Sequence, residues 1–240
     1  MEAVKPYKKS FDYSYTLGAF PTFELLKARP EQVRAVYVHS TFTDRQALAQ
    51  LCGAGHIPLL EGDRLIARLS EKENCFVVGV FEKYECVLEA SLPHVVLVNP
   101  GNMGNLGTII RTLTGFGIYD LAIIAPGADS FNPKTVRSSM GALFRIRHRY
   151  FESFAEYRRQ YPKHELFTFM LDGERTLEAG SCPKPELFSL VFGNEAAGLD
   201  ASFHNEGTSV FIPQTKDVDS LNLTIAVGIG AYLFMQGRIS

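Results

Sequence analysis

The chain has 240 residues, which is enough for one large domain or two small ones. Apolar residues make up 46%, charged residues make up 21% and the formal net charge is −2, so collagen-like and disordered classes are excluded. This charge argues neither for nor against an anionic partner. The longest apolar run, Leu223 to Met235, is shorter than the roughly twenty residues that cross a bilayer, so we expect no transmembrane helix and no membrane partner. The N-terminus lacks the apolar stretch of a signal peptide, which predicts a cytoplasmic protein.

The four cysteines are too widely spaced for a zinc or redox motif. Cys52, Cys75, Cys86 and Cys182 include no C-x-x-C pair. We therefore expect four reduced thiols, most of them buried, and no metal site.

The first half of the chain alternates short strands and helices. The polar segment 81–93 ends in a proline and precedes another strand, so it is the best linker candidate. We place the domain boundary at about residue 90, which gives domains 1–90 and 91–240. Ahead of it, β-branched and aromatic runs predict strands at 35–38 and 76–81, and helical spacing predicts helices at 43–51 and 63–69, with Thr43 and Gly62 or Asp63 as N-caps.

The second half predicts an α/β fold with a largely parallel sheet, because strands alternate with helices. A helix at 106–116 is closed by Gly117, and a final helix spans 220–235. The expected strands are 94–98, 120–125, 189–192 and 210–212.

A glycine-rich junction lies between the strand 94–98 and the following helix. Its glycines stand at 101, 104 and 107, a G-x-x-G-x-x-G spacing, and the next strand ends without a ribose-binding acid. A nicotinamide-dependent oxidoreductase is therefore disfavoured. The candidate functional residues are Asn105 and Arg111. The alternative is an asparagine that caps the helix and an arginine that pairs with surface acids.

Two further junctions follow later strands. Gly193, Asn194 and Glu195 come directly after the strand 189–192, at the sheet edge where open α/β folds bind ligands. The alternative there is a left-handed turn with a solvated glutamate. After the strand 210–212, Asp219 or Ser220 is placed to cap the final helix, which would leave the Asn222 amide free to orient a ligand. Capping alone is the alternative.

The three junctions together, in this order, resemble the three signature motifs of the SpoU/TrmH family of RNA ribose 2′-O-methyltransferases. The motifs are N-x-G-x-x-x-R from Asn105 to Arg111, F-G-N-E-x-x-G-L from Phe192 to Leu199, and I-P-x-x-x-x-x-x-S-L-N from Ile212 to Asn222. The resemblance covers residues 94–235. An extra Asn102-Met103-Gly104 precedes the first motif, which leaves open whether Asn102 or Asn105 faces the substrate.

The resemblance implies a SPOUT-type (α/β-knot) catalytic domain with a deep C-terminal trefoil knot, which binds S-adenosylmethionine and works as a homodimer. The first half resembles, more loosely, the L30e-like RNA-binding domain of rRNA-modifying family members. This likeness rests on Leu17-Gly-Ala-Phe, Val36-Tyr-Val-His, Ile57-Pro and Phe76-Val-Val-Gly-Val. It favours rRNA over tRNA as the substrate.

The resemblance also assigns roles to residues. Arg111 would contact the ribose hydroxyl and its phosphate, either as the base or as a stabiliser of developing oxyanion charge, and Asn105 would position the ribose or the arginine. With these two, the expected catalytic residues include Glu195, Ser220 and Asn222. The expected cofactor-binding residues are Phe192, Gly193, Asn194, Glu195, Gly198, Ile212, Pro213, Ser220, Leu221 and Asn222.

A basic stretch with interleaved aromatic residues is the candidate RNA contact. No acid occurs between Asp129 and Glu152, and local positive charge with aromatics suits phosphate contact and base stacking. The alternative is a strand with Phe144, Ile146 and Tyr150 in the core. The predicted RNA-binding residues are Lys134, Arg137, Arg145, Arg147 and Arg149.

The sequence therefore predicts an S-adenosylmethionine-dependent RNA ribose 2′-O-methyltransferase, with rRNA the favoured substrate and tRNA the alternative. Methyl transfer to a hydroxyl needs alignment and proton removal rather than a metal. The rival from another class is a non-catalytic RNA-binding or ribosome-assembly protein on the same fold.

Overall fold

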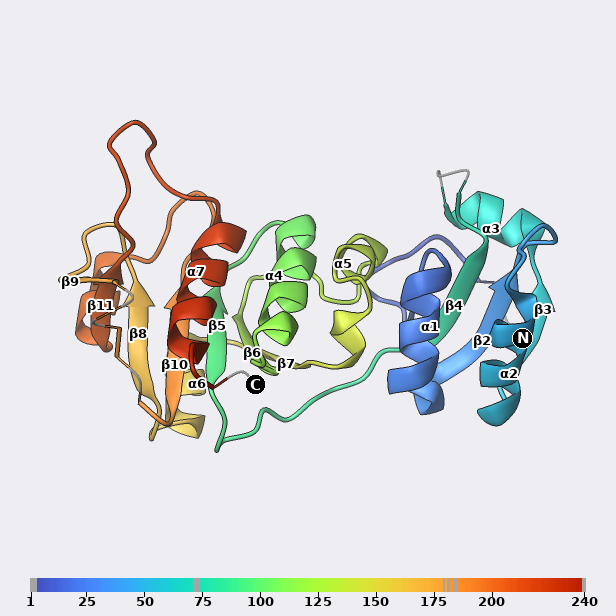
Figure 1. Ribbon diagram of the computed structural model, residues 1–240, viewed down its shortest axis with the longest axis horizontal. Helices are drawn as coiled ribbons and strands as arrows, with labels where there is room; N and C mark the ends of the chain where they lie inside the picture. The colour runs from blue at the N-terminus through green and yellow to red at the C-terminus, as the bar shows by residue number, and fades with distance from the viewer. Residues whose placement is uncertain (1–3, 71–73, 179, 181, 184, 239–240) are drawn as a thin grey trace. The chain divides into compact units, whose positions relative to one another are not determined.

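The computed structural model describes residues 4–70, 74–178, 180, 182–183 and 185–238 (Figure 1). The chain forms two compact units. The first consists of Met1–Tyr84 and Asp129–Arg145, and the second of Glu85–Ala128 and Ile146–Ser240.

The first unit is built on a mixed sheet of four strands in its described part, in the order β1-β4-β2-β3. β4 is antiparallel to both β1 and β2, whereas β3 is parallel to β2. The strands are β1 (Tyr13–Tyr15), β2 (Val33–Val38), β3 (Leu59–Glu61) and β4 (Val77–Glu82). The helices are α1 (Ala19–Ala28), η1 (Pro30–Gln32), α2 (Arg45–Ala54) and α3 (Asp63–Leu69).

Alternation along the strands of the first unit gives it two apolar clusters. One packs Val36 and Val38 with Leu26 of α1 and Leu48 of α2. The other packs Val78 and Val80 of β4 with Tyr15 and with Ile66 of α3. Because successive side chains of a strand point to opposite faces, one sheet supports both clusters.

The segment 129–145 belongs to the first unit, although the sequence analysis assigned it to domain 91–240. It contains α5 (Pro133–Ser138) and η2 (Ala142–Phe144). Its Phe131 and Phe144 rings pack against Phe81 of β4, with centroids 6.2 and 5.2 Å away. Hydrophobic periodicity identifies these rings as core but not which core they join, so the sequence did not reveal this placement.

The second unit is built on a parallel sheet of seven strands in its described part, which confirms the predicted α/β class. Its order is β7-β6-β5-β10-β8-β11-β9, and every neighbouring pair is parallel. The strands are β5 (His94–Val98), β6 (Asp120–Ile124), β7 (Arg147–Phe151), β8 (Glu165–Phe169), β9 (Arg175–Thr176), β10 (Phe188–Phe192) and β11 (Thr208–Phe211).

The helices of the second unit cover this sheet. α4 and α7 contact each other and lie in front of the sheet in Figure 1. Among the described residues, no helix has both the length and the apolar character needed to span a membrane. The helical elements are α4 (Met103–Gly115), α6 (Phe154–Gln160), η3 (Ala201–Asn205) and α7 (Leu223–Met235).

The two motif-bearing helices begin at positions different from the predicted ones. α4 begins at Met103 rather than 106, because the Asn102 side chain caps it. α7 begins at Leu223 rather than 220, because Asn222 is its N-cap. Asp219 and Ser220 therefore do not cap the final helix, contrary to the prediction. The knotted path implied by the resemblance stays a prediction.

Candidate active site

A cavity of about 470 Å³ opens at the carboxyl ends of β8, β10 and β11. This is the edge where open α/β sheets bind ligands. The volume lies within the range of small-molecule sites. Four segments line it: residues 169–172 at the end of β8, residues 192–199 at the end of β10, residues 210–212 and 214 at the end of β11, and residues 220, 221, 223 and 226 around the start of α7.

The turn after β10 forms one wall of the cavity from bare backbone. Asn194 and Gly198 exchange backbone hydrogen bonds of 3.2 and 2.9 Å, and Gly198 adopts φ +69°. A Cβ added to Gly193 would lie 2.0 Å from the Gly198 carbonyl carbon. Only glycine therefore fits at position 193. The left-handed turn considered as the alternative at Gly193 and Asn194 forms instead at Gly198.

Glu195 joins this turn to the first glycine-rich junction. Its carboxylate accepts hydrogen bonds from the backbone N–H groups of Gly101 (2.9 Å) and Asn102 (3.1 Å). The side-chain amide of Asn105 donates a third at 3.2 Å. Burial by itself raises the pKa of the Glu195 carboxyl, but these hydrogen bonds outweigh it and hold the pKa below its usual range. Asn194 adds a bond from its Nδ2 to the Asn99 carbonyl at 2.7 Å.

The structure separates the roles of the two asparagines that the motif left open. The Asn102 Oδ1 accepts from the N–H groups of Gly104 (2.8 Å) and Asn105 (3.1 Å), which is a helix N-cap. Asn105, in the first turn of α4, instead reaches Glu195. An asparagine therefore does cap the helix, as in the alternative considered for Asn105, but that asparagine is Asn102.

Arg111 lies on an exposed part of α4 and does not line the cavity. Six residues at 100° each place its side chain about 240° around the helix from Asn105, so the two side chains point to different sides. Within the described part of the chain, the Arg111 guanidinium makes no hydrogen bond or ion pair, so pairing with surface acids does not account for it.

The third junction contributes to the cavity through only part of its motif. Ile212, Ser220 and Leu221 line it, whereas Pro213 and Asn222 do not. The Asn222 Oδ1 caps α7 by accepting from the backbone N–H and the hydroxyl of Thr224, at 2.8 and 2.7 Å. Among the described residues, the Asn222 amide nitrogen has no hydrogen bond.

Sequence reasoning missed the wall formed after β8. Phe169, Met170, Leu171 and Asp172 line the cavity, but the strand before them was not predicted. The signal was present, because Glu165-Leu-Phe-Thr-Phe is an aromatic run that is followed by the turn pair Asp172-Gly173.

The predicted RNA-binding residues fall into two groups. Arg145 pairs with Glu24 (2.7 Å), Arg147 forms an ion pair with the buried Asp120, and Arg149 lies over the Phe151 ring (5.1 Å). For Lys134 and Arg137, at α5, the described residues provide no side-chain partner. Phe144 and Ile146 are buried, as in the core alternative, whereas Tyr150 is exposed.

The fold and this cavity define a class, an α/β protein with a small-molecule site at the carboxyl edge of a parallel sheet. The model of the SpoU rRNA Methylase family matches residues 93–232, more than half of the chain. The chain belongs to the SpoU rRNA methylase family.

The relatives include proteins named for rRNA modification and proteins named for tRNA modification. The chain is 34% identical over 133 residues to the 23S rRNA (guanosine(2553)-2'-O)-methyltransferase RlmP of Bacillus subtilis, covering 54% of this chain and 52% of that protein. It is 31% identical over 144 residues to a putative tRNA (cytidine(34)-2'-O)-methyltransferase of Listeria monocytogenes, covering 58% of this chain and 84% of that protein. The chain thus spans about half the length of the first of these relatives.

A solved structure extends the likeness to both units. The crystal structure of the AdoMet-bound rRNA methyltransferase from Sinorhizobium meliloti matches with a TM-score of 0.80 at 25% identity. The match covers 95% of this chain and 89% of that one.

Proposed function

We propose that this chain transfers a methyl group from S-adenosylmethionine to a ribose 2′-hydroxyl of RNA. The observation that carries this proposal is the Glu195 bridge, which joins the helix of the N-x-G-x-x-x-R motif to the wall of the cavity. Family membership and the cofactor in the Sinorhizobium meliloti structure support the same reaction.

The cavity fits S-adenosylmethionine in size and in the chemistry of its walls. Phe192, Ile212 and Leu221 offer apolar surface for an adenine ring, and Gly193 lets a flat ligand lie against backbone. The bound cofactor supplies an electrophilic methyl group. The proposed binding residues are Phe192, Gly193, Asn194, Glu195, Gly198, Ile212, Pro213, Ser220, Leu221 and Asn222. Pro213 and Asn222 would act from just outside the cavity described above.

Arg111 is the proposed contact for the ribose hydroxyl and the adjacent phosphate. Its guanidinium is unengaged among the described residues. Either it stabilises developing oxyanion charge while the phosphate takes the proton, or contact with the phosphate and the cofactor first removes a proton from the guanidinium, which then accepts the hydroxyl proton as the base. Asn105 and Glu195 act as positioning residues, since their contacts are with each other and with the junction backbone.

A homodimer would bring a second copy to this side of the molecule. α7 is apolar along its length, yet Ile225 is 53% exposed and Tyr232 is 49% exposed. The Tyr232 ring lies 5.9 Å from Phe116, which follows α4. Exposed apolar side chains along one helix are typical of a protein interface.

The proposed RNA is rRNA, with tRNA as the alternative. RlmP modifies 23S rRNA by its name, and the L30e-like pattern of the first unit supports the same class. In that unit, Phe20 and Phe76 are exposed aromatic rings suited to base stacking. The proposed phosphate contacts are Lys134, Arg137, Arg145, Arg147 and Arg149. Lys134 and Arg137 can bind a phosphate without first breaking an ion pair. An RNA substrate and four free cysteines support a cytoplasmic location.

Methyl transfer from labelled S-adenosylmethionine to unmodified rRNA and to tRNA tests the proposal. We expect label on the ribose of rRNA, its loss in Arg111→Ala, and its retention in Arg159→Ala, an exposed arginine of α6. Label on tRNA alone would reassign the substrate. Binding of S-adenosylmethionine and RNA without transfer would favour the non-catalytic binder.

A further inference from the structure

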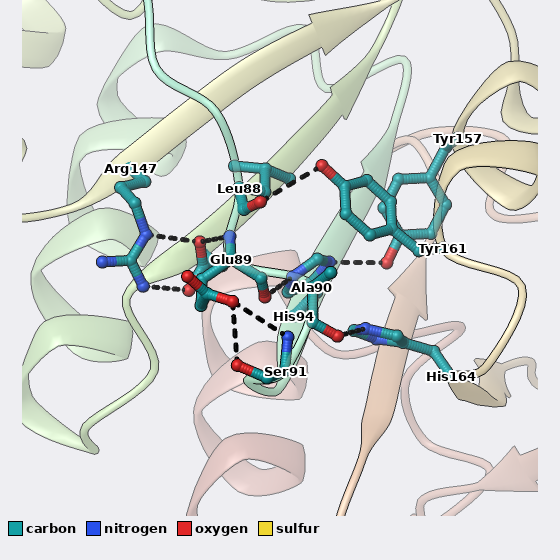
Figure 2. A network of polar contacts seen from close by, with 10 residues as sticks. Leu88, Glu89, Ala90, Ser91, His94, Arg147, Tyr157, Tyr161 and His164 are labelled. Atoms are coloured by element: carbon teal, nitrogen blue, oxygen red, sulfur yellow. Dashed lines mark hydrogen bonds and ion pairs between the residues drawn. The ribbon is translucent and has the colours of Figure 1, made fainter.

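A buried series of polar side chains lies at the amino-terminal edge of the second unit's sheet, opposite the cavity. Figure 2 shows three of its members, His94, Tyr157 and His164. His94 is the first residue of β5 and Ser189 is the second residue of β10. Tyr157 comes from α6, and His164 directly precedes β8. All four side chains are essentially buried, so water does not compete for their hydrogen bonds.

These four side chains form a continuous series of short contacts. His94 Nδ1 lies 2.9 Å from the Tyr157 hydroxyl, which lies 2.6 Å from the Ser189 hydroxyl. That hydroxyl lies 2.8 Å from His164 Nδ1. The outer ring nitrogens face backbone carbonyls, His94 Nε2 at 2.9 Å from Glu89 and His164 Nε2 at 3.2 Å from Ala90.

The number of available hydrogens fixes which group donates in each contact of this series. With both imidazoles neutral, five contacts share four hydrogens, because each ring, the tyrosine and the serine bring one. If the longest contact, His164 to Ala90, is the one without a hydrogen, every other contact has a donor. His94 then carries its hydrogen on Nε2 and His164 on Nδ1, where Phe188 O is a second acceptor at 3.2 Å.

The series of four side chains holds the connector, residues 85–93, which follows the first unit and leads into β5. The connector contains no helix or strand, so it depends on side chains of the second unit. His94 donates from Nε2 to the Glu89 carbonyl, while His164 fixes the orientation of the series through Ser189. In addition, the Tyr161 hydroxyl donates to the Leu88 carbonyl (3.4 Å), and Asp120 accepts from the Glu89 N–H (2.8 Å). Figure 2 shows three successive carbonyls, those of Leu88, Glu89 and Ala90, each facing a different aromatic side chain.

The charges around the two imidazoles do not compensate a buried positive charge. Asp120 is paired with Arg147, and the Glu89 carboxylate binds Ser91. Arg158, which donates to the His164 carbonyl at 2.9 Å, adds positive charge beside that ring. Tyr157 and Tyr161 are neutral phenols, and burial raises the pKa of both.

A proton added to the closed chain would supply the missing hydrogen but would bury a charge. Desolvation of a charge outweighs one hydrogen bond. The His94 and His164 ring centroids are 4.3 Å apart, so two imidazolium ions would also repel each other. Consistent with this, burial lowers the pKa of His94 to about 4 and also lowers the pKa of His164.

We propose that His94, Tyr157, Ser189 and His164 form an acid-sensitive clamp, which holds the connector while both imidazoles are neutral and opens with uptake of protons. Opening exposes both rings to water, where an imidazole binds a proton readily near pH 6. The clamp is a conformational device separate from the methyl-transfer site, and it stands whether or not the proposed reaction is correct.

The hydrogen positions are tested on the unmodified protein. Long-range ¹H–¹⁵N spectra of histidine-labelled full-length chain at pH 7 should show His94 protonated on Nε2 and His164 on Nδ1, both neutral. His94→Gln and His164→Gln spectra assign the signals. An imidazolium at either position at pH 7 would overturn the proposal.

Hydrogen exchange tests the opening. With a closed-state pKa of about 4 and an open-state value near 6.5, His94 alone should raise the open population of the connector about twentyfold between pH 7 and pH 5, after correction for intrinsic exchange, and His164 should raise it further. Amides of β6, in the core, should not follow. A connector without this rise, or a core that opens in step with it, contradicts a local clamp.

Matched variants identify the titrating groups. His94→Gln should reduce the pH-dependent rise in the open population to a few-fold. His204 lies in η3 and is not part of the series of four side chains, so His204→Gln should retain the full rise. Full retention in His94→Gln refutes the role of that ring. If His94→Gln does not fold, His164→Gln provides the same comparison, and the spectra of the unmodified protein still decide.

Discussion

The carboxylate of Glu195 and the side-chain amide of Asn105 lie 3.2 Å apart although 90 residues separate them in sequence. This contact unites two glycine-rich junctions that follow different strands. Since the carboxylate also accepts two backbone N–H groups, a single side chain sets the position of the first junction relative to the cavity wall.

Glu195→Gln should impair methyl transfer through misplacement of the junction. The amide offers one acceptor in place of two and turns an N–H₂ toward existing donors, so we expect at least a tenfold loss of kcat. Charge-assisted hydrogen bonds contribute about 1.5–3 kcal/mol each, so denaturant unfolding should also show a measurable loss of stability. Glu206→Gln, an exposed glutamate in the same unit, is the matched control and should change neither. An unaltered kcat in Glu195→Gln would show that the junction holds its position without the bridge.

Gly193→Ala should distort the turn whose backbone forms one wall of the cofactor cavity. The new Cβ would meet the Gly198 carbonyl carbon at 2.0 Å, and that atom is backbone that cannot rotate away. We expect S-adenosylmethionine binding, measured by calorimetry, to weaken at least tenfold. Gly53→Ala is the control: it lies in α2 with no atom within 4 Å of the added Cβ, and should leave binding intact while stabilising the fold by about 0.5–1 kcal/mol. Equal binding by both variants would argue against a ligand at this wall.

Arg147→Gln should reduce stability more than RNA affinity. Asp120 is fully buried and Arg147 is its ion-pair partner, so removal of the guanidinium leaves an unpaired buried carboxylate. We expect a loss of about 2–4 kcal/mol, less than for a fully buried pair because a third of Arg147 faces solvent. Arg137→Gln should instead keep stability and lower the salt slope of RNA binding by about one unit. The reverse pattern, a stable Arg147→Gln that loses RNA binding, would restore Arg147 as a phosphate contact.

Acid should destabilise the second unit through His94. Its pKa is about 4 in the fold and near 6.5 when unfolded, so the unfolded state binds more protons between these values and stability falls as the pH falls through this window. The full difference corresponds to roughly 3 kcal/mol by pH 4. Urea unfolding at several pH values measures it. In His94→Gln the slope between pH 6.5 and 4 should flatten; an unchanged slope would place the proton uptake on another group.

The sequence by itself determined the α/β class, the positions of the junctions and the family. Strands such as 94–98 and the helix 63–69 were predicted with their observed bounds, because local periodicity and caps define such elements. Asn105, Glu195 and the glycines at 193 and 198 could be named because the motif spacing is itself local.

Tertiary structure alone decided which partners these residues meet. Asn102 and Asn222 meet only neighbouring backbone N–H groups as helix caps, whereas Glu195 reaches Asn105 across 90 residues. Segment 129–145 joined the first unit because its phenylalanines pack against Phe81, far away in sequence. The pairing of Arg147 with Asp120, and of His94 with the connector, likewise depends on strand order. A local pattern carries no information about strand order, since it arises from long-range packing.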